Sequence, residues 1–377
     1  MQFTEDQLLI RNMVREFAEN EVKPIAAEID REHRFPAETV KRMAELGLFG
    51  LAVPEEYEGS GGDTLSYILA VEELSRVCAS HAITVEVHVS LCAHAILLNG
   101  TEEQKKKYLP DLCSGRKLGG FALTEPGAGT DAAAQQTVAE LKGDKYIING
   151  SKVFITNSGV GETFVIFAMT DKSKGLKGIS AFIVESSFPG FTVGQAEEKL
   201  GIRASATHEL IFTNMEVPVE NMLGKEGQGF KIAMSTLDGG RIGIAAQAVG
   251  IAQAALDAAI SYTKERIQFG KPISANQGIQ WMLADMATEL QAARLLTYDA
   301  AMKRDTGERY SMEAAMAKLK AASVAMDISV KSIQLHGGIG FTTNYPVERF
   351  MRDAKITEIY EGTSQVQKMV ISGGLLA

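Results

Sequence analysis

The hydrophobic pattern of the chain changes twice, near residue 119 and near residue 226. Outside these two points apolar residues recur at helical spacing, and the last third is rich in alanine. Between them, short apolar runs alternate with glycine and proline, which is typical of strands joined by turns. The sequence therefore predicts an α+β fold with an N-terminal α-helical domain (1–118), a middle β domain (119–225) and a C-terminal α-helical bundle (226–377).

Local signals refine this plan. Thr4 with Gln7, and Thr101 with Gln104, have the spacing of capping boxes, so a helix should begin after each threonine. Asn149-Gly150 stands between two apolar runs and predicts a β-hairpin turn. Three long helices are expected in the last third, over 241–266, 279–304 and 312–335.

Composition excludes several classes of protein. The formal net charge is −9, so we expect no nucleic-acid partner. The three cysteines are scattered and predict buried thiols, with no disulfide framework and no metal site. No apolar run reaches the length of a membrane span, so no membrane insertion is expected, and the first residues resemble neither a signal peptide nor a transit peptide. A cytoplasmic location in a prokaryote, or a mature form, is therefore expected.

Glu361 is the strongest candidate for a catalytic group. It stands between Tyr360 and Gly362, close to the end of the chain. A general base needs a proton acceptor, an apolar wall that raises its pKa and room for the substrate. Tyr360 would supply the wall and Gly362 the room. A solvated glutamate at a helix end has the same local sequence, and it is the commoner case when the motif is taken alone.

Three further stretches carry chemistry, and each also has a plain structural interpretation. Phe121 to Asp131 contains two glycines, Gly127 and Gly129, and suits close approach to a heterocycle or phosphate, or is an ordinary Pro-Gly turn. Gln334 to Phe341 superficially resembles a dinucleotide-binding loop, but a helix precedes it, so a glycine C-cap explains it equally well. Arg266 to Gly270 offers a cation for a phosphate and a ring for an adenine, a weak pattern by itself.

Together these stretches resemble the acyl-CoA dehydrogenase family, in order and across essentially the whole chain. The segments 122–134 and 334–353 are similar to two family signatures, and 359–363 is similar to the catalytic-base segment. The runs 237–243 and 367–370 are most similar to bacterial short-chain (butyryl-CoA) dehydrogenases. The resemblance implies an acyl-CoA dehydrogenase-like fold whose C-terminal part is a four-helix bundle.

The resemblance also implies non-covalently bound FAD. Residues expected along the two sides of the flavin are Phe121, Leu123, Thr124, Thr130, Phe154, Ile155 and Thr156. Many relatives carry tryptophan where this chain has Phe154, which should alter stacking without abolishing binding. Residues expected to contact the FAD of a neighbouring subunit are Arg266, Phe269, Gln277, Gln334, Leu335, His336, Gly337 and Gly338. Further FAD contacts are expected from Thr363, Ser364 and Gln365. A cofactor shared between subunits implies a homo-oligomer, typically a dimer of dimers.

The implied reaction oxidises a short-chain acyl-CoA to the trans-2-enoyl-CoA. Glu361 would take the α-proton while the β-hydride passes to FAD, and electron-transferring flavoprotein would accept the electrons. The backbone amide of Glu361 and a flavin hydroxyl would stabilise the enolate oxygen. Residues expected at the substrate are Thr130, Asp238, Arg241, Tyr360 and Gly362. Some branched-chain relatives place their base at the position of Gly240, which here has no side chain.

Glu86 departs from the family pattern, since relatives usually have a small residue there. It is expected either on a helix surface or at the far end of the acyl pocket, where it would pair with His88 or a lysine or recognise a polar acyl end. Two alternatives to the dehydrogenase remain open: an enoyl-CoA reductase that runs the reverse reaction, and a non-catalytic flavin- or CoA-binding homologue. The sequence does not fix acyl length, direction in the cell or reactivity with oxygen.

Overall fold

The computed structural model describes residues 2–377. The N-terminal part of the chain is a helical domain. Both predicted capping boxes are present, at Thr4 and at Thr101, so local sequence alone sets the start of the two helices that follow. All three cysteines are buried free thiols, as predicted. The helices are α1 (Glu5–Phe17), α2 (Ala26–Glu32), α3 (Ala37–Glu45), α4 (Thr64–Ser75), α5 (Ala79–Glu86), α6 (His94–Asn99) and α7 (Glu102–Cys113), with π-helical turns at Ala18–Val22 and Val87–Ala93.

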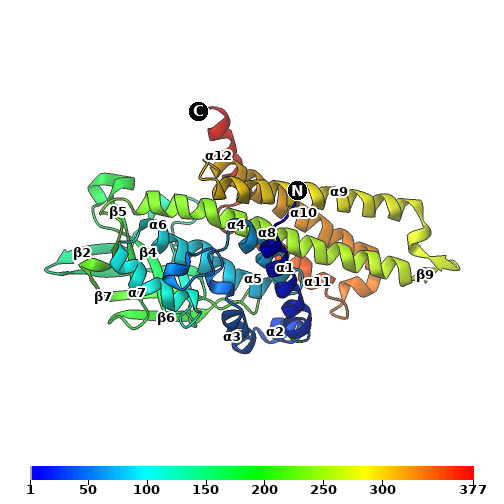
Figure 1. Cartoon of the computed structure of the whole chain (residues 1–377), viewed down its shortest axis with the longest axis horizontal. Helices are drawn as coiled ribbons and strands as arrows, with labels where there is room; N and C mark the ends of the chain where they lie inside the picture. Colours follow the sequence, from blue (N-terminus) through cyan, green and yellow to red (C-terminus); the bar gives the residue numbers. More distant parts are fainter. Residues whose placement is uncertain (1) are drawn as a thin grey trace.

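A mostly antiparallel eight-stranded sheet follows, in the order β6-β7-β3-β2-β4-β5-β8, with β1 paired in parallel to β4. Its strands are β1 (Gly119–Ala122), β2 (Val138–Lys142), β3 (Lys145–Thr156), β4 (Thr163–Met169), β5 (Ile179–Glu185), β6 (Phe191–Ala196), β7 (Thr207–Pro218) and β8 (Met222–Leu223). β4 is buried along its whole length because it lies inside the sheet, between β5 and the strands β1 and β2. Figure 1 shows the strands gathered at one end of the molecule.

The predicted hairpin at Asn149-Gly150 is wrong. β3 runs straight through these residues, and Gly150, with φ +148°, forms a bulge where the pairing with β7 shifts register. The Asn149 side chain bonds to Asn214 on β7 across the bulge. The tight turn lies instead at Gly143-Asp144, where β2 and β3 meet. An Asn-Gly pair is suited to both features, because each needs a residue that tolerates unusual backbone angles.

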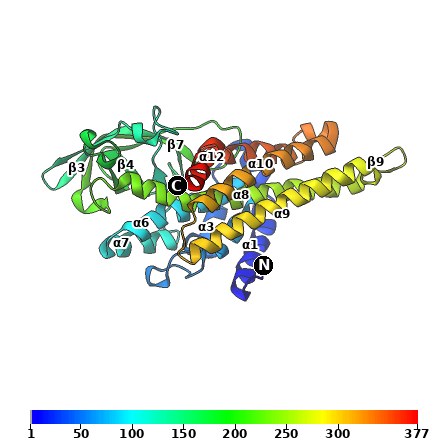
Figure 2. The same cartoon turned by 90° about the horizontal axis from the view of Figure 1, so that it is seen from above.

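The chain returns to helices with α8 (Gly229–Glu265), α9 (Gln277–Asp305), α10 (Ser311–His336), α11 (Val347–Thr357) and α12 (Ser364–Leu375). A short hairpin, β9 (Ile267–Gln268) and β10 (Lys271–Pro272), joins α8 to α9. Figures 1 and 2 show α8, α9 and α10 lying side by side and carrying that hairpin to the end opposite the sheet. The predicted order of helices, strands and helices is therefore confirmed.

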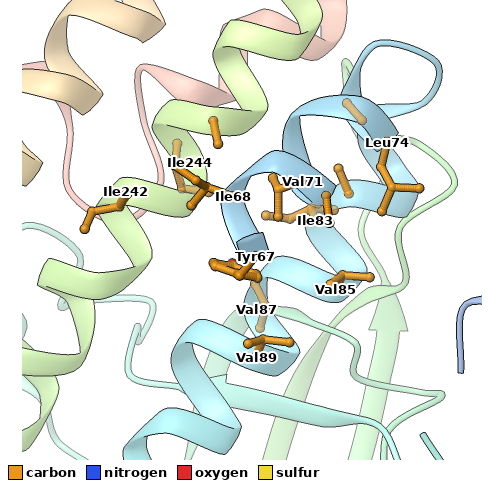
Figure 3. Packing of buried hydrophobic residues seen from close by; sticks show 14 of the residues in the cluster. Tyr67, Ile68, Val71, Leu74, Ile83, Val85, Val87, Val89, Ile242 and Ile244 are labelled. Atoms are coloured by element: carbon orange, nitrogen blue, oxygen red, sulfur yellow. The ribbon is translucent and has the colours of Figure 1, made fainter. Parts of the chain in front are cut away.

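The main core lies where α4, α5 and α8 cross. Tyr67, Ile68 and Val71 of α4 pack against Ile83 of α5 and Ile244 of α8 (Figure 3). Each fully buried aliphatic side chain contributes about 1.5–3 kcal/mol relative to an exposed one. This packing fixes α8 beside the π-helical turn at Val87–Ala93, and the candidate site lies along that contact.

Two segments are longer and more apolar than the sequence analysis anticipated. Ala79–Asn99 and Gly229–Glu265 both reach the length and hydropathy of a membrane span. Most of each segment is buried inside the protein, as expected of core helices.

Candidate active site

Glu361 lies in the turn between α11 and α12, in the left-handed region with φ +52°. Such a backbone is uncommon for a residue with a side chain, and surrounding contacts must hold it. Lys318 of α10 donates a hydrogen bond of 2.6 Å to the carbonyl of Gly362, and Gln367 of α12 donates one of 2.7 Å to the same oxygen. Thr363 then caps α12 by accepting from the Val366 N–H. Two helices therefore fix the turn that presents Glu361.

The carboxylate of Glu361 faces inward. The residue is half-buried, yet both its oxygens are shielded from solvent, and no amide, hydroxyl or cationic group within residues 2–377 donates a hydrogen bond to them. A second carboxyl group, that of Glu86, faces them. Burial raises the pKa of Glu361 to about 7, although a hydrogen bond from Glu86 and the charges of Lys318 and Arg241 oppose the rise. A buried carboxylate that no cation pairs with directly and whose pKa lies near neutral pH has the properties of a general base.

A cavity of about 190 Å³ opens beside this carboxylate. It brings together residues from five separate parts of the chain, which supports the interpretation of Glu361 as part of a site and not as a solvated helix end. The expected site residues that line it are Phe121, Leu123, Thr124, Thr130, Phe154, Ile155, Thr156, Arg241, Tyr360, Glu361 and Gly362. Gly129, in the segment from Phe121 to Asp131, also lines it. The apolar part of the wall was not predicted from the sequence, and it comes from Val87, Leu91, Ala132, Met234, Leu237 and Val366.

The loop after β1 is held by a buried ion pair that the sequence did not reveal. Lys152 of β3 lies 2.8 Å from Glu125 and donates a second hydrogen bond of 3.1 Å to the carbonyl of Leu123. Glu125 in turn accepts the backbone N–H groups of Gln136 (2.5 Å) and Thr137 (3.0 Å). Both ends of the segment 123–137 are therefore tied to the sheet, which leaves Thr124 and Thr130 in the cavity wall.

Phe154 stands on the other side of the cavity in a strained backbone, with φ +61°. Its ring is 64% exposed, although it sits in a strand whose neighbours Ile155 and Lys152 are buried. The hydroxyls of Thr124 and Thr130, the exposed ring of Phe154 and the unpaired carboxylate of Glu361 together suit a flat, polar-edged heterocycle with a substrate beside it. These residues therefore fit a flavin.

Arg241 and Asp238, both on α8, are placed differently. Arg241 lines the cavity and is paired with Asp238 at 2.6 Å. Asp238 also accepts a 2.5 Å hydrogen bond from Ser311 at the start of α10. Asp238 therefore lies behind the cavity wall, where it orients Arg241.

The residues expected at a neighbouring subunit's FAD lie elsewhere. Arg266, Leu335, His336, Gly337 and Gly338 line a second cavity of about 440 Å³, close to the β9–β10 hairpin. Phe269 is fully exposed at the tip of that hairpin, Gln277 opens α9, and Gln334 lies in the last turn of α10. Figure 1 shows β9 of this hairpin at the end of the molecule opposite the sheet. The expected glycine C-cap is present, since Gly337 with φ +65° ends α10, and the His336 ring stacks on Tyr262.

Ser364 and Gln365 follow the cap residue Thr363 in the first turn of α12. They lie directly after the Glu361 turn and not at the β9–β10 end.

Glu86 is fully buried, so the expectation of a helix-surface position is wrong. The cavity wall is formed by the next residue, Val87. His88 does not pair with Glu86: its ring bonds to the backbone of Leu112 (3.0 Å) and Gly119 (2.9 Å). One Glu86 oxygen accepts a 2.6 Å hydrogen bond from Ser90, one turn along the chain.

Sequence profiles place this site within one family. The N-terminal, middle and C-terminal domains of acyl-CoA dehydrogenases match residues 4–116, 120–215 and 227–376. The chain belongs to the acyl-CoA dehydrogenase family. It is accordingly an FAD-dependent oxidoreductase that acts on a CH–CH bond.

Two relatives with named activities are similar to this chain over nearly its whole length. The chain is 63% identical over 370 residues to a short-chain specific acyl-CoA dehydrogenase of Clostridium acetobutylicum, with 98% of each chain covered. It is 52% identical to an acryloyl-CoA reductase (NADH) of Anaerotignum propionicum, covering 98% of this chain and 94% of the relative.

Solved structures agree. Butyryl-CoA dehydrogenase from Megasphaera elsdenii superposes with a TM-score of 0.99 at 51% identity, with both chains fully covered. A chain from a structure described as an electron transferring flavoprotein of Acidaminococcus fermentans has a TM-score of 0.99 at 57% identity, covering 100% of this chain and 99% of that one.

Proposed function

We propose that the protein oxidises a short-chain acyl-CoA, of which butyryl-CoA is the type, to the trans-2-enoyl-CoA, with Glu361 as the base. The observation that carries the proposal is the buried carboxylate of Glu361, which has no salt-bridge partner within residues 2–377 and lies beside the cavity that Thr124, Thr130 and Phe154 help to line. The short-chain relatives support the substrate class.

The apolar wall beside Glu361 also favours a short acyl chain. Side chains such as Val87 and Leu91 line the cavity there. A longer chain would have to displace side chains that pack against α8.

FAD, when bound, supplies the acceptor for the β-hydride. We propose that Thr124, Thr130 and Phe154 bind FAD together with the turn at Thr363 of the same chain. Arg266 and the residues beside it at the β9–β10 hairpin would bind the FAD of a second copy. The last assignment requires a homo-oligomer, a dimer at least and a dimer of dimers by family resemblance. It is supported by the separation of the two sites within one chain: the β9–β10 hairpin lies at the end opposite the sheet, and the cavity beside Glu361 shares no residue with the one near the hairpin.

Residues of the chain itself would carry out proton abstraction and stabilise the charge that develops. Glu361 takes the α-proton on a carboxylate oxygen, and its own backbone N–H donates to the thioester oxygen as negative charge develops there. Lys318 and Gln367 keep the turn rigid through the carbonyl of Gly362. Leu91, Leu237 and Met234 exclude water from the reacting carbon. Because the base acts when ionised, the rate should rise with pH through about 7.

We further propose that the protein passes its electrons to electron-transferring flavoprotein and works in the cytoplasm. The flavoprotein structure above supports the partner, and the bacterial relatives support the location. The relative that reduces acryloyl-CoA favours one second candidate, the same site run towards reduction of an enoyl-CoA.

Anaerobic mixing of the purified flavoprotein with a panel of acyl-CoAs tests the proposal. Butyryl-CoA should bleach the bound flavin faster than octanoyl-CoA or isovaleryl-CoA. Equal bleaching across the panel would contradict the short-chain assignment. Bleaching by none of them, with crotonyl-CoA oxidising the reduced protein, would favour the reductase.

A further inference from the structure

A second carboxyl group lies directly against the proposed base. Glu86 ends α5, and the π-helical turn Val87–Ala93 begins at the next residue. Its side chain is completely buried, and one oxygen accepts a hydrogen bond from Ser90. No group within residues 2–377 donates a hydrogen bond to the other oxygen. If that oxygen carries a proton, it can itself donate to an acceptor nearby. π-helical turns inside α-helices are frequent at functional positions.

Both carboxyl groups rest on the same face of α8, over two glycines one turn apart. A Cβ on Gly240 would stand 2.1 Å from Oε2 of Glu361, and a Cβ on Gly243 would stand 2.4 Å from Oε1 of Glu86. Any side chain at either position would therefore push a carboxyl group away. Because Gly240 and Gly243 lie one turn apart on α8, the two carboxyl groups that rest on them are neighbours, and each affects the pKa of the other.

The surrounding charges favour one negative charge in this pair, on Glu361. Lys318 of α10 and Arg241 of α8 act on Glu361. Glu86 faces the hydroxyls of Ser90 and of Tyr67 on α4, and Tyr360 lies beside both carboxyl groups. Arg304 of α9 acts on Tyr67. Burial, and next the charge of Glu361, raise the pKa of Glu86 well above its ordinary value.

We propose that Glu86 is a positioning residue: a neutral carboxylic acid that donates a hydrogen bond to the Glu361 carboxylate, holds it over Gly240 and keeps it ionised near neutral pH. This inference rests on the proposed role of Glu361 as the base. The buried acid offsets part of the cost of burying the Glu361 charge, because hydrogen bonds to charged groups are stronger than neutral ones. Catalysis needs Glu86 protonated and Glu361 ionised.

Two substitutions of Glu86 separate this role from simple packing. The rate of flavin bleaching should rise with pH as Glu361 ionises, and this rise is the acid limb of the pH profile. Glu86→Gln keeps a hydrogen-bond donor of the same shape, so the acid limb should stay near that of the wild type. Glu86→Met keeps the volume but has no donor, so the acid limb should move up by about 1–2 pH units. A packing role would lower the rate in both variants without moving that limb. An ionised Glu86 would instead make Glu86→Gln move the limb down, and either result overturns the proposal.

Infrared spectroscopy provides a readout that needs neither turnover nor a stable methionine variant. At pH 8.5 most Glu361 should be ionised, so a protonated-carboxyl C=O band should remain in the wild type and disappear in Glu86→Gln. Its absence in the wild type would contradict the inference. Glu361→Gln distinguishes the two proposals: if that variant still bleaches, the assignment of the base fails, whereas a dead Glu361→Gln with an unmoved acid limb in Glu86→Met refutes only the role of Glu86.

Discussion

Replacing Gly240 by alanine should cost most of the rate of flavin reduction while leaving the flavin bound. The added Cβ would lie 2.1 Å from Oε2 of Glu361 and 2.8 Å from Cδ2 of Leu91. Carbon and oxygen atoms settle near 3.4 Å, so the carboxylate must move by roughly 1 Å. A displacement of about 1 Å of a reacting group costs on the order of 100-fold in rate.

Gly239→Ala is the matched control. It lies on the same helix, and its added Cβ would meet only the guanidinium end of Arg304, at 2.9 Å, which can shift. Both variants should gain helix stability of up to about 1 kcal/mol from the loss of a helical glycine. Stopped-flow bleaching with butyryl-CoA under anaerobic conditions compares the two. A Gly240→Ala protein that bleaches as fast as Gly239→Ala would refute the placement of Glu361 against α8.

Three further outcomes follow from the buried charges of the site. The folded protein holds a proton on Glu361 up to a pKa of about 7, against 4.5 for an exposed glutamate. This raised pKa should lower the free energy of unfolding by about 3 kcal/mol as pH rises between these values. Urea titrations at pH 5 and pH 8 should therefore show a smaller fall in Glu361→Gln than in the wild type, and the fall that remains comes from groups such as Glu86, whose pKa is also raised. Lys152→Met leaves Glu125 buried without its cation and should cost about 3–5 kcal/mol of stability, with lower flavin content after gel filtration. Lys318→Met removes a cation near Glu361 and the bond to Gly362, so its acid limb of bleaching should move to higher pH; an unmoved limb would contradict the charge balance described for the site.

The order of helices and strands could be predicted because the hydrophobic period of each third of the chain is set by its own packing. The boundaries were harder. α8 begins at Gly229, twelve residues before the expected start at Arg241, because Gly239 and Gly240 argue against a helix by local propensity. Packing overrides that propensity, since these glycines make room for Arg304 and Glu361.

The site residues that lie in recognisable short motifs could be predicted from the sequence. Glu361 and the loop with Thr124 and Thr130 are each marked by unusual local sequence, whereas the segment at Phe154 was expected only from the family resemblance; the structure brings all three to one cavity. The buried pair Lys152 and Glu125 leaves no such mark, because the two residues are 27 positions apart and only the sheet joins them.

Glu86 illustrates the same limit. Its sequence context is compatible with a surface or a pocket, and only the folded chain shows that it lies beneath the base, against Gly243.

The proton-abstracting role of Glu361 is tested most directly by single-turnover bleaching of the Glu361→Gln flavoprotein with butyryl-CoA. The variant should purify with its flavin, bind the substrate and leave the flavin oxidised, because an amide does not accept the α-proton. Exchange of the substrate α-hydrogens with D₂O should likewise stop. Bleaching or exchange at the wild-type rate would show that another group removes the proton.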